Sequence, residues 1–281
     1  MSGQVGRAVA FATDAAGLER FLRFFHSIFI ILTSCPSLLS NFLLSSQPSS
    51  LHGSSIKSIL QLQSHVSLTR RTIRLFWFLD SFQSSWRHYI SSASSAGSNL
   101  PETWIDILSK SAFGMFGMME SATLLDLARV DGVSVFGFDE AVRLDAEAQA
   151  LWFIALSTSA LSTAIKLFRL SSSHRAPQTD EPDTQQGEKK TRGRTRQERA
   201  EAKELVRRQA AEKAAALEMS HRSVALGMKL LADLLDLMIP ASRIGWIKVH
   251  GGLVGVAMLG STILTGITVW DRCAKKLEKN V

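Results

Sequence analysis

Apolar residues recur at helical spacing along most of the chain and predict an all-α protein associated with a membrane. The clearest element covers residues 249–270, which contain no Asp, Glu, Lys or Arg. A helix of this length reaches roughly 33 Å, and the hydrocarbon core of a bilayer is about 30 Å thick. Trp246 and Trp270 bracket the stretch, as interfacial aromatic residues do. We therefore expect a transmembrane anchor here.

A row of small residues marks one face of this anchor. Gly251 and Gly255 form a G-x-x-x-G motif, and Ala257, Ser261 and Thr265 continue the row. Small residues let two membrane helices approach closely, so we assign Gly251 and Gly255 to helix association and expect self-association of the chain. The alternative is a buried helix of a soluble protein, but each glycine costs an exposed helix roughly 1 kcal/mol relative to alanine.

Residues 14–33 predict an amphipathic helix with Asp14 as its N-cap. An arc of roughly 120° on the helical wheel is polar and holds Glu19, Arg20, Arg23, His26 and Ser27. The opposite side is apolar and holds Leu18, Phe21, Leu22, Phe25, Ile28, Phe29 and Leu32. We assign Arg20 and Arg23 to membrane binding.

A second helical region is expected over residues 56–90, where cations lie beside an aromatic apolar face. Arg70, Arg71 and Arg74 share one narrow sector. The apolar sector consists of Leu68, Leu75, Leu79, Phe82 and Trp86. Interfacial helices place such rings at headgroup depth and guanidinium groups at lipid phosphates. Membrane binding is therefore assigned to Arg70, Arg71, Arg74, Leu75, Leu79, Phe82 and Trp86; the alternative is a core-facing helix with solvated arginines.

Three further apolar stretches predict helices over residues 101–130, 146–170 and 224–239. In the second, only about fifteen residues from Leu151 precede Lys166, fewer than the roughly 20 that span a bilayer. This stretch is a tilted span, a re-entrant piece or a helix packed on the others. Pro240 is expected to end the third helix. Asp233 and Asp236, three positions apart, are interpreted as the polar edge of that helix.

The composition changes between these helices. Residues 171–196 hold few apolar side chains and predict a disordered linker, and residues 197–219 predict a solvated helix. We divide the chain into an amphipathic-helix membrane-remodelling region (1–170), a disordered and basic linker (171–222) and a C-terminal helix with the anchor (223–281). Residues 189–222 carry eleven Lys or Arg against five Glu, which fits nucleic-acid association as a minor alternative. No aromatic platform accompanies them, so no nucleic-acid partner is expected.

The sequence offers no convergent catalytic or metal-binding chemistry. Cys35 and Cys273 lie too far apart for a zinc motif, and the seven histidines are scattered. Neither a G-x-S-x-G motif nor a phosphate-cradling glycine loop occurs. We expect no enzymatic activity, no catalytic residue, no metal site and no cofactor. The expected partner is an anionic lipid surface.

The order of these elements resembles the peroxisomal biogenesis factor eleven family, the membrane-elongating peroxins. Its opening basic segment is similar to Gly17-Leu-Glu-Arg-Phe-Leu-Arg23. Its arginine-marked amphipathic helix is similar to Ser67-Leu-Thr-Arg-Arg-Thr-Ile-Arg-Leu-Phe-Trp-Phe-Leu79. Its terminal helix pair is similar to Leu230-Leu-Ala-Asp-Leu-Leu-Asp236 followed by Val254-Gly-Val-Ala-Met-Leu-Gly-Ser-Thr-Ile-Leu264.

The resemblance implies a peroxisomal membrane protein that promotes elongation, proliferation and fission of the organelle. Amphipathic helices that enter one leaflet by about 5–10 Å crowd that leaflet and bend the bilayer. In this interpretation residues 67–86 are the principal wedge, residues 14–33 assist and residues 249–270 anchor the chain. Fission machinery is a further partner that the resemblance implies. The alternative function is a peroxisomal membrane channel for small metabolites.

Overall fold

The computed structural model describes residues 3–35, 37, 51–94, 101–129, 132–173 and 196–279. In this part of the chain nearly all residues are helical and none lies in a strand, so the expected all-α fold is confirmed for it. Most of the linker expected over residues 171–196 lies outside the described residues.

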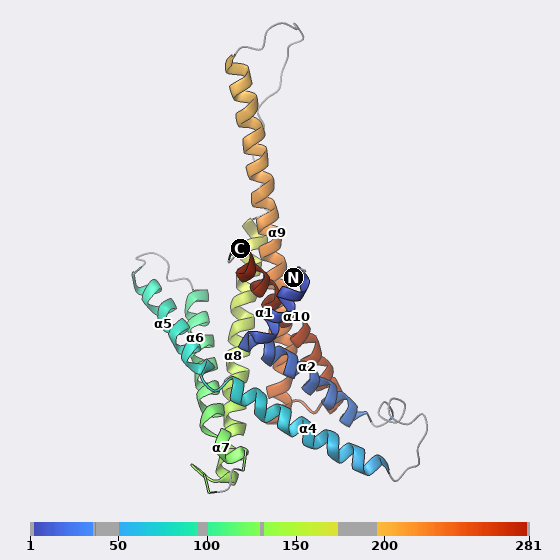
Figure 1. Cartoon of the computed structure of the whole chain (residues 1–281). Coiled ribbons are helices and arrows are strands. Elements are labelled where there is room, and N and C mark those ends of the chain that lie inside the picture. Colours follow the sequence, from blue (N-terminus) through green and yellow to red (C-terminus); the bar gives the residue numbers. More distant parts are fainter. Residues whose placement is uncertain are drawn as a thin grey trace. The chain divides into compact units, whose positions relative to one another are not determined.

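Nine helices occur in the described residues (Figure 1). They are α1 (Gly3–Thr13), α2 (Ala15–Ser34), α4 (Leu51–Ile73), α5 (Trp77–Ser94), α6 (Pro101–Ala122), α7 (Leu124–Leu127), α8 (Phe138–Ser173), α9 (Arg196–Ile244) and α10 (Gly251–Lys279). The chain divides into two compact units. The first unit comprises residues 1–163 and 228–281, and the second comprises residues 164–227.

The second unit contains the end of α8 and the first part of α9. Most of the side chains described there are exposed, and the ion pair between Arg208 and Glu204, at 3.0 Å, is exposed too. Such surface pairs contribute roughly 0–1 kcal/mol. The solvated helix expected over residues 197–219 is thus present as the first half of α9.

The helix expected over residues 56–90 is broken between Ile73 and Trp77, so the prediction of one helix was wrong. Here the backbone N–H groups of Arg74, Leu75 and Trp77 donate to carbonyl oxygens three residues back, at 3.1, 3.2 and 2.9 Å. This spacing is that of a tight 3₁₀-type turn. Because neither Gly nor Pro stands in the break, the residue pattern gave no signal of it.

The helix expected from residue 146 begins earlier, at Phe138. The Asp126 carboxylate fixes the preceding loop, since it accepts hydrogen bonds from the N–H groups of Val135, Phe136 and Gly137 at 3.0, 3.1 and 3.3 Å. The count of about fifteen residues from Leu151 therefore underestimated the length of this helix. Two helices of the described residues, α8 and α10, are long and apolar enough to cross a membrane.

The helix expected to end before Pro240 continues to Ile244, which corrects that boundary. Proline lacks an N–H group and therefore leaves the carbonyl oxygen four residues earlier without its helical partner. Only one further turn follows before the end of α9. The chain then turns at Gly245, whose φ of +85° lies in the left-handed region that favours glycine.

Serine hydroxyls join α8 to its neighbours in the first unit. The Ser109 hydroxyl of α6 donates to the Ala155 carbonyl oxygen at 2.8 Å, and the Ser159 hydroxyl of α8 donates to the Asp233 carboxylate of α9 at 2.7 Å. Asp233 also pairs with Lys229, at 2.6 Å. Hydroxyl contacts of this kind are common between helices in membranes.

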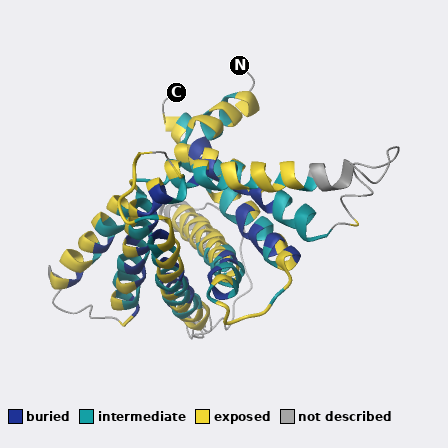
Figure 2. Ribbon diagram, turned by 90° about the horizontal axis from the view of Figure 1, so that it is seen from below, coloured by how far each residue is buried: buried dark blue, intermediate teal, exposed yellow. Residues whose placement is uncertain are grey.

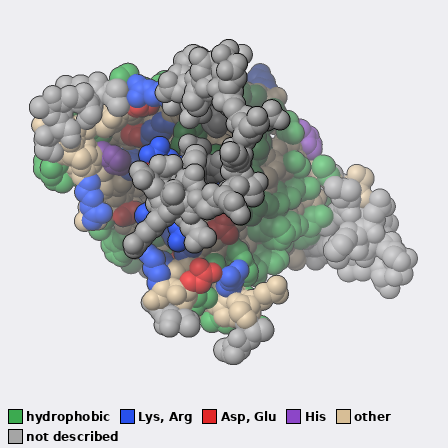
Figure 3. All heavy atoms as spheres, turned by 90° about the horizontal axis from the view of Figure 1, so that it is seen from above, with side chains coloured by type: hydrophobic (Ala, Val, Ile, Leu, Met, Phe, Trp, Pro, Cys, Tyr) green, Lys and Arg blue, Asp and Glu red, His purple; other side chains and the backbone are tan. Residues whose placement is uncertain are grey.

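The first unit has polar side chains inside and large apolar side chains outside. Figure 2 shows where the buried and exposed residues lie along the helices. Apart from alanine, few apolar side chains are buried, whereas eight buried side chains are acidic, basic or histidine: Glu19, Arg23, His26, Arg70, Glu102, Glu120, Asp126 and Asp236. Outward-facing apolar residues include Phe21, Phe76, Leu79, Trp86, Leu161, Leu253 and Val256. Hydrophobic side chains likewise cover a broad part of the face seen in Figure 3. This distribution opposes stability in water and suits a lipid environment.

Candidate functional site

Helix α2 turns its polar side into the first unit. Asp14 caps the helix as expected, and its carboxylate accepts hydrogen bonds from the N–H groups of Ala16 and Gly17 at 3.0 and 3.4 Å. Glu19 is 1% exposed, and Arg23 is also buried. Helix α2 therefore has the polar and apolar faces expected from the helical wheel, and its charged face is directed inward.

The small-residue face of α10 lies against α2. A Cβ atom on Gly255 would stand 2.8 Å from Ile31 Cγ1, and one on Gly251 would stand 2.7 Å from Ser34 Oγ. The close approach that the G-x-x-x-G motif predicts is thus made within the chain. A second copy would have to displace α2 to reach Gly251 and Gly255, so self-association through this face stays a prediction.

Ion pairs cross the interior of the first unit and join helices that are distant in sequence, and four of them are close pairs. Arg70 of α4 donates from Nε and Nη2 to Glu19 Oε1 of α2, at 3.1 and 2.8 Å. Arg23 of α2 pairs with Asp236 of α9. The other two pairs are Arg71 with Asp145, at 2.9 Å, and Arg74 with Glu120, at 2.7 Å. These pairs connect α2, α4, α6, α8 and α9.

The electrostatic field of the arginines fixes the charge states of two buried groups of α2. Burial opposes ionisation of Glu19, but attraction by Arg20, Arg70 and Arg74 outweighs it and lowers the pKa of the carboxyl to about 2. Burial together with repulsion from Arg70 lowers the pKa of His26 to about 3. His26 is therefore neutral at physiological pH, and Arg70 Nη1 lies 2.7 Å from its Nδ1.

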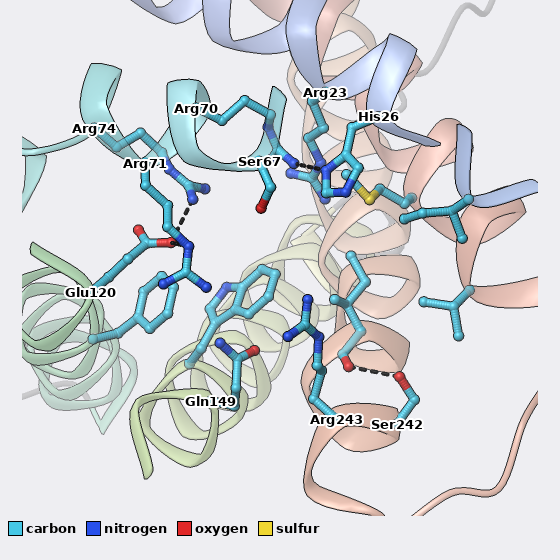
Figure 4. A pocket seen from close by; sticks show the side chains of 16 residues that line it. Arg23, His26, Ser67, Arg70, Arg71, Arg74, Glu120, Gln149, Ser242 and Arg243 are labelled. Carbon is cyan, nitrogen blue, oxygen red and sulfur yellow. Dashed lines mark hydrogen bonds and ion pairs between the residues drawn. The ribbon is translucent and has the colours of Figure 1, made fainter. Parts of the chain in front are cut away.

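A cavity of about 110 Å³ lies beside these pairs. In Figure 4 the side chains of Arg70, Arg71 and Arg74 face those of Gln149 and Arg243 across this space. The charged residues that line it are Arg23, Arg70, Arg71, Arg74, Arg243 and Glu120. Five cations and a single carboxylate thus border the cavity, which we call the arginine cavity.

The structure places the residues assigned to membrane binding in two different settings. Five are arginines that pair with carboxylates inside the first unit: Arg20, Arg23, Arg70, Arg71 and Arg74. Of the apolar residues, Leu79 and Trp86 are 55% and 61% exposed, whereas Leu75 and Phe82 are half-buried. A Cβ atom on Gly114 would stand 2.6 Å from the Phe82 ring, so this ring packs on α6. Membrane contact by these residues stays a prediction.

The acidic partners of the arginines were missed at the level of sequence. Glu120 and Asp145 lie 46 and 74 positions from the arginines to which they bond. The sequence did indicate that these acidic residues have partners, because an ionisable residue inside an otherwise apolar helix usually has a charged partner. Gln149 and Arg243 carried no such signal.

The described residues include no group of three His, Cys, Asp or Glu that could hold a metal ion. Cys35 and Cys273 are free thiols. The five arginines that line the arginine cavity can attract an anion through their charge and donate hydrogen bonds to it.

The family model for Peroxisomal biogenesis factor 11 (PEX11) matches residues 37–270. The matched stretch includes α4 to α9 and most of α10, and it begins after α2. No curated protein matches the chain, and no solved structure matches it.

Proposed function

Because the chain belongs to the peroxisomal biogenesis factor 11 family, we propose that it elongates and divides peroxisomes by inserting helices into one leaflet of the membrane. The family consists of peroxisomal membrane proteins with a role in proliferation and division of the organelle, and it is not a known enzyme family. Helix insertion and self-association are our additions to that role.

The outward apolar face of α5 and the turn before it support insertion. Phe76 is 67% exposed, and Leu79 and Trp86 are exposed on the same segment. Burying such a side chain in an apolar phase contributes roughly 1.5–3 kcal/mol. The apolar side of α2 is likewise exposed at Phe21 and Phe25, so it assists in the same way.

The arginines orient this wedge in our proposal. Arg71 and Arg74 pair with carboxylates of α8 and α6, and Arg70 pairs with α2. Since these partners neutralise them, the apolar residues supply most of the attraction to lipid. The pairs hold α4, and the turn leading into α5, against the helices of the anchor.

Anchoring is assigned to α8 and α10, and self-association is assigned to outward faces. Leu253, Val256 and Ile263 of α10 are exposed and lie on the side away from the glycine row. A second copy could contact them without displacing α2. Repeated along the membrane, such contacts would align many wedges, and fission machinery, as implied by the family, would divide the resulting tubule.

Liposome tubulation by the full-length chain tests the wedge. The double variant Phe76→Glu/Leu79→Glu places two charges on the exposed apolar face, and we expect it to abolish tubules seen by electron microscopy. The matched control, Thr72→Glu/Gln83→Glu, adds the same charges at exposed polar positions and should tubulate normally. Equal tubulation by the two variants at equal membrane incorporation would overturn the proposal.

A channel for small metabolites is the second candidate, and the polar interior favours it. The arginine cavity shares Arg23 and Glu120 with a neighbouring cavity of about 230 Å³, and it shares Ser67 and Arg243 with another of about 380 Å³. Purified protein in planar bilayers would separate the two functions, since a wedge bends membranes without conducting solutes.

A further inference from the structure

The arginine cavity has properties that neither insertion nor anchoring requires. Its volume of about 110 Å³ exceeds the roughly 10–15 Å³ that one water needs. It lies within the first unit, where α2, α4, α6, α8 and α9 each contribute a polar side chain to its lining and α10 contributes Val254 and Met258. The space is therefore large enough for a small polar group.

The charges around the cavity do not balance. Five arginines line it, which are Arg23, Arg70, Arg71, Arg74 and Arg243. The carboxylates paired with them are Glu19, Glu120, Asp145 and Asp236. Since His26 is neutral, five cations against four anions leave a surplus of one positive charge. An anion would compensate this surplus.

Several hydrogen-bond donors at the cavity are unused. Gln149 is 6% exposed, yet its amide makes no hydrogen bond with any described residue. Arg243 is exposed and forms no ion pair within the described part of the chain, whereas Arg23 Nε and Arg74 Nε are buried without a partner there. Buried polar groups normally have partners, so the Gln149 amide and these two Nε groups indicate a missing acceptor. Figure 4 shows the side chains of Gln149 and Arg243, which both line the cavity.

Phosphate has the chemistry that this site lacks. It carries up to two negative charges and only acceptor oxygens, and the planar guanidinium fork binds it through two parallel hydrogen bonds. We propose that the arginine cavity binds a phosphate group, carried either by a soluble phosphate or by the headgroup of an anionic lipid. This proposal does not depend on helix insertion.

Calorimetric titration of the purified full-length chain in neutral detergent tests the site. One arm uses inorganic phosphate, and the other uses short-chain phosphatidic acid with short-chain phosphatidylcholine as its control. Arg243→Gln removes an arginine without an ion pair, so the fold should persist. Since hydrogen bonds to charged groups contribute about 1.5–3 kcal/mol, we expect Kd to rise about 10- to 100-fold. Arg87→Gln removes an exposed arginine of α5 and should leave Kd unchanged.

The two arms distinguish the sources. Binding of both probes that Arg243→Gln weakens shows that the phosphate group suffices, and binding of phosphatidic acid alone assigns the site to a lipid headgroup. Gln149→Leu keeps the size of the side chain and should also weaken binding, which provides a second variant should Arg243→Gln misfold. Failure of both probes to bind, or equal binding by Arg243→Gln and Arg87→Gln, overturns the proposal.

Discussion

Glu19 is the carboxylate whose removal tests the polar interior most directly. It lies 2.8 Å from Arg70, 3.3 Å from Arg20 and 3.8 Å from Arg74, and it is 1% exposed. Glu19→Gln keeps the shape of the side chain and removes the charge. Three guanidinium groups then face one another without their shared counter-charge, so we expect a large loss of stability.

The magnitude follows from the burial of the pairs. Removing one partner of a buried ion pair costs about 3–5 kcal/mol, because the other charge remains without compensation. An exposed pair contributes only about 0–1 kcal/mol. Arg7 and Glu278 form such a pair at 3.3 Å, with the glutamate side chain 68% exposed. Glu278→Gln is therefore a matched control with the same chemical change.

Unfolding of both variants in detergent micelles, followed by circular dichroism against denaturant, measures the difference. We expect Glu19→Gln to lower the free energy of unfolding by about 3 kcal/mol or more, and Glu278→Gln by less than about 1 kcal/mol. The double variant Glu19→Gln/Arg70→Gln should cost less than the sum of its single changes, because the two groups interact. Equal effects of Glu19→Gln and Glu278→Gln would refute a buried, tightly paired interior.

Three further predictions concern the packing, the pH dependence and the topology. Gly255→Val should cost about 1–3 kcal/mol of unfolding free energy because its Cβ would stand 2.8 Å from Ile31 Cγ1, while Gly266→Val, with open space at its Cβ, should not. Burial and Arg70 lower the pKa of His26 to about 3, so the unfolded chain takes up a proton near pH 6.5 that the folded chain does not. The free energy of unfolding should then fall as pH drops below 6.5, by about 1.4 kcal/mol per pH unit. Unfolding of His26→Gln, measured at pH 7 and 5.5, should lack the pH dependence that is due to His26. If α8 and α10 both cross the membrane, both termini face the cytosol, and an epitope at position 185 should be protected from protease in intact peroxisomes; cleavage there would contradict two crossings.

The sequence predicted the helices well where an amphipathic pattern and a cap coincide. Asp14 and the periodic residues after it located α2 within a residue at each end. The uncharged run and its flanking tryptophans located α10, although this helix continues to Lys279. These features are local, because caps and periodicity depend on neighbours within one or two turns.

The features that sequence reasoning missed depend on contacts between distant segments. The break before Trp77 has no breaker residue, and hydrogen bonds from Arg74 and Ser121 hold that turn against α6. The early start of α8 depends on Asp126, which accepts its bonds across the preceding loop. The arginine cavity also depends on contacts between distant segments, because the carboxylates that pair with its arginines come from α2, α6, α8 and α9.

An amphipathic pattern defines two faces of a helix and leaves open which of them meets the solvent. For α2, the carboxylate of Glu19 within the arginine arc carries the missing information. An anionic lipid surface attracts Arg20 and Arg23 but repels a carboxylate beside them, so this arc is poorly suited to headgroups. Inside a protein the same carboxylate is what the arginines require. The charged arc therefore faces inward, and the apolar side of α2 is left to meet the lipid.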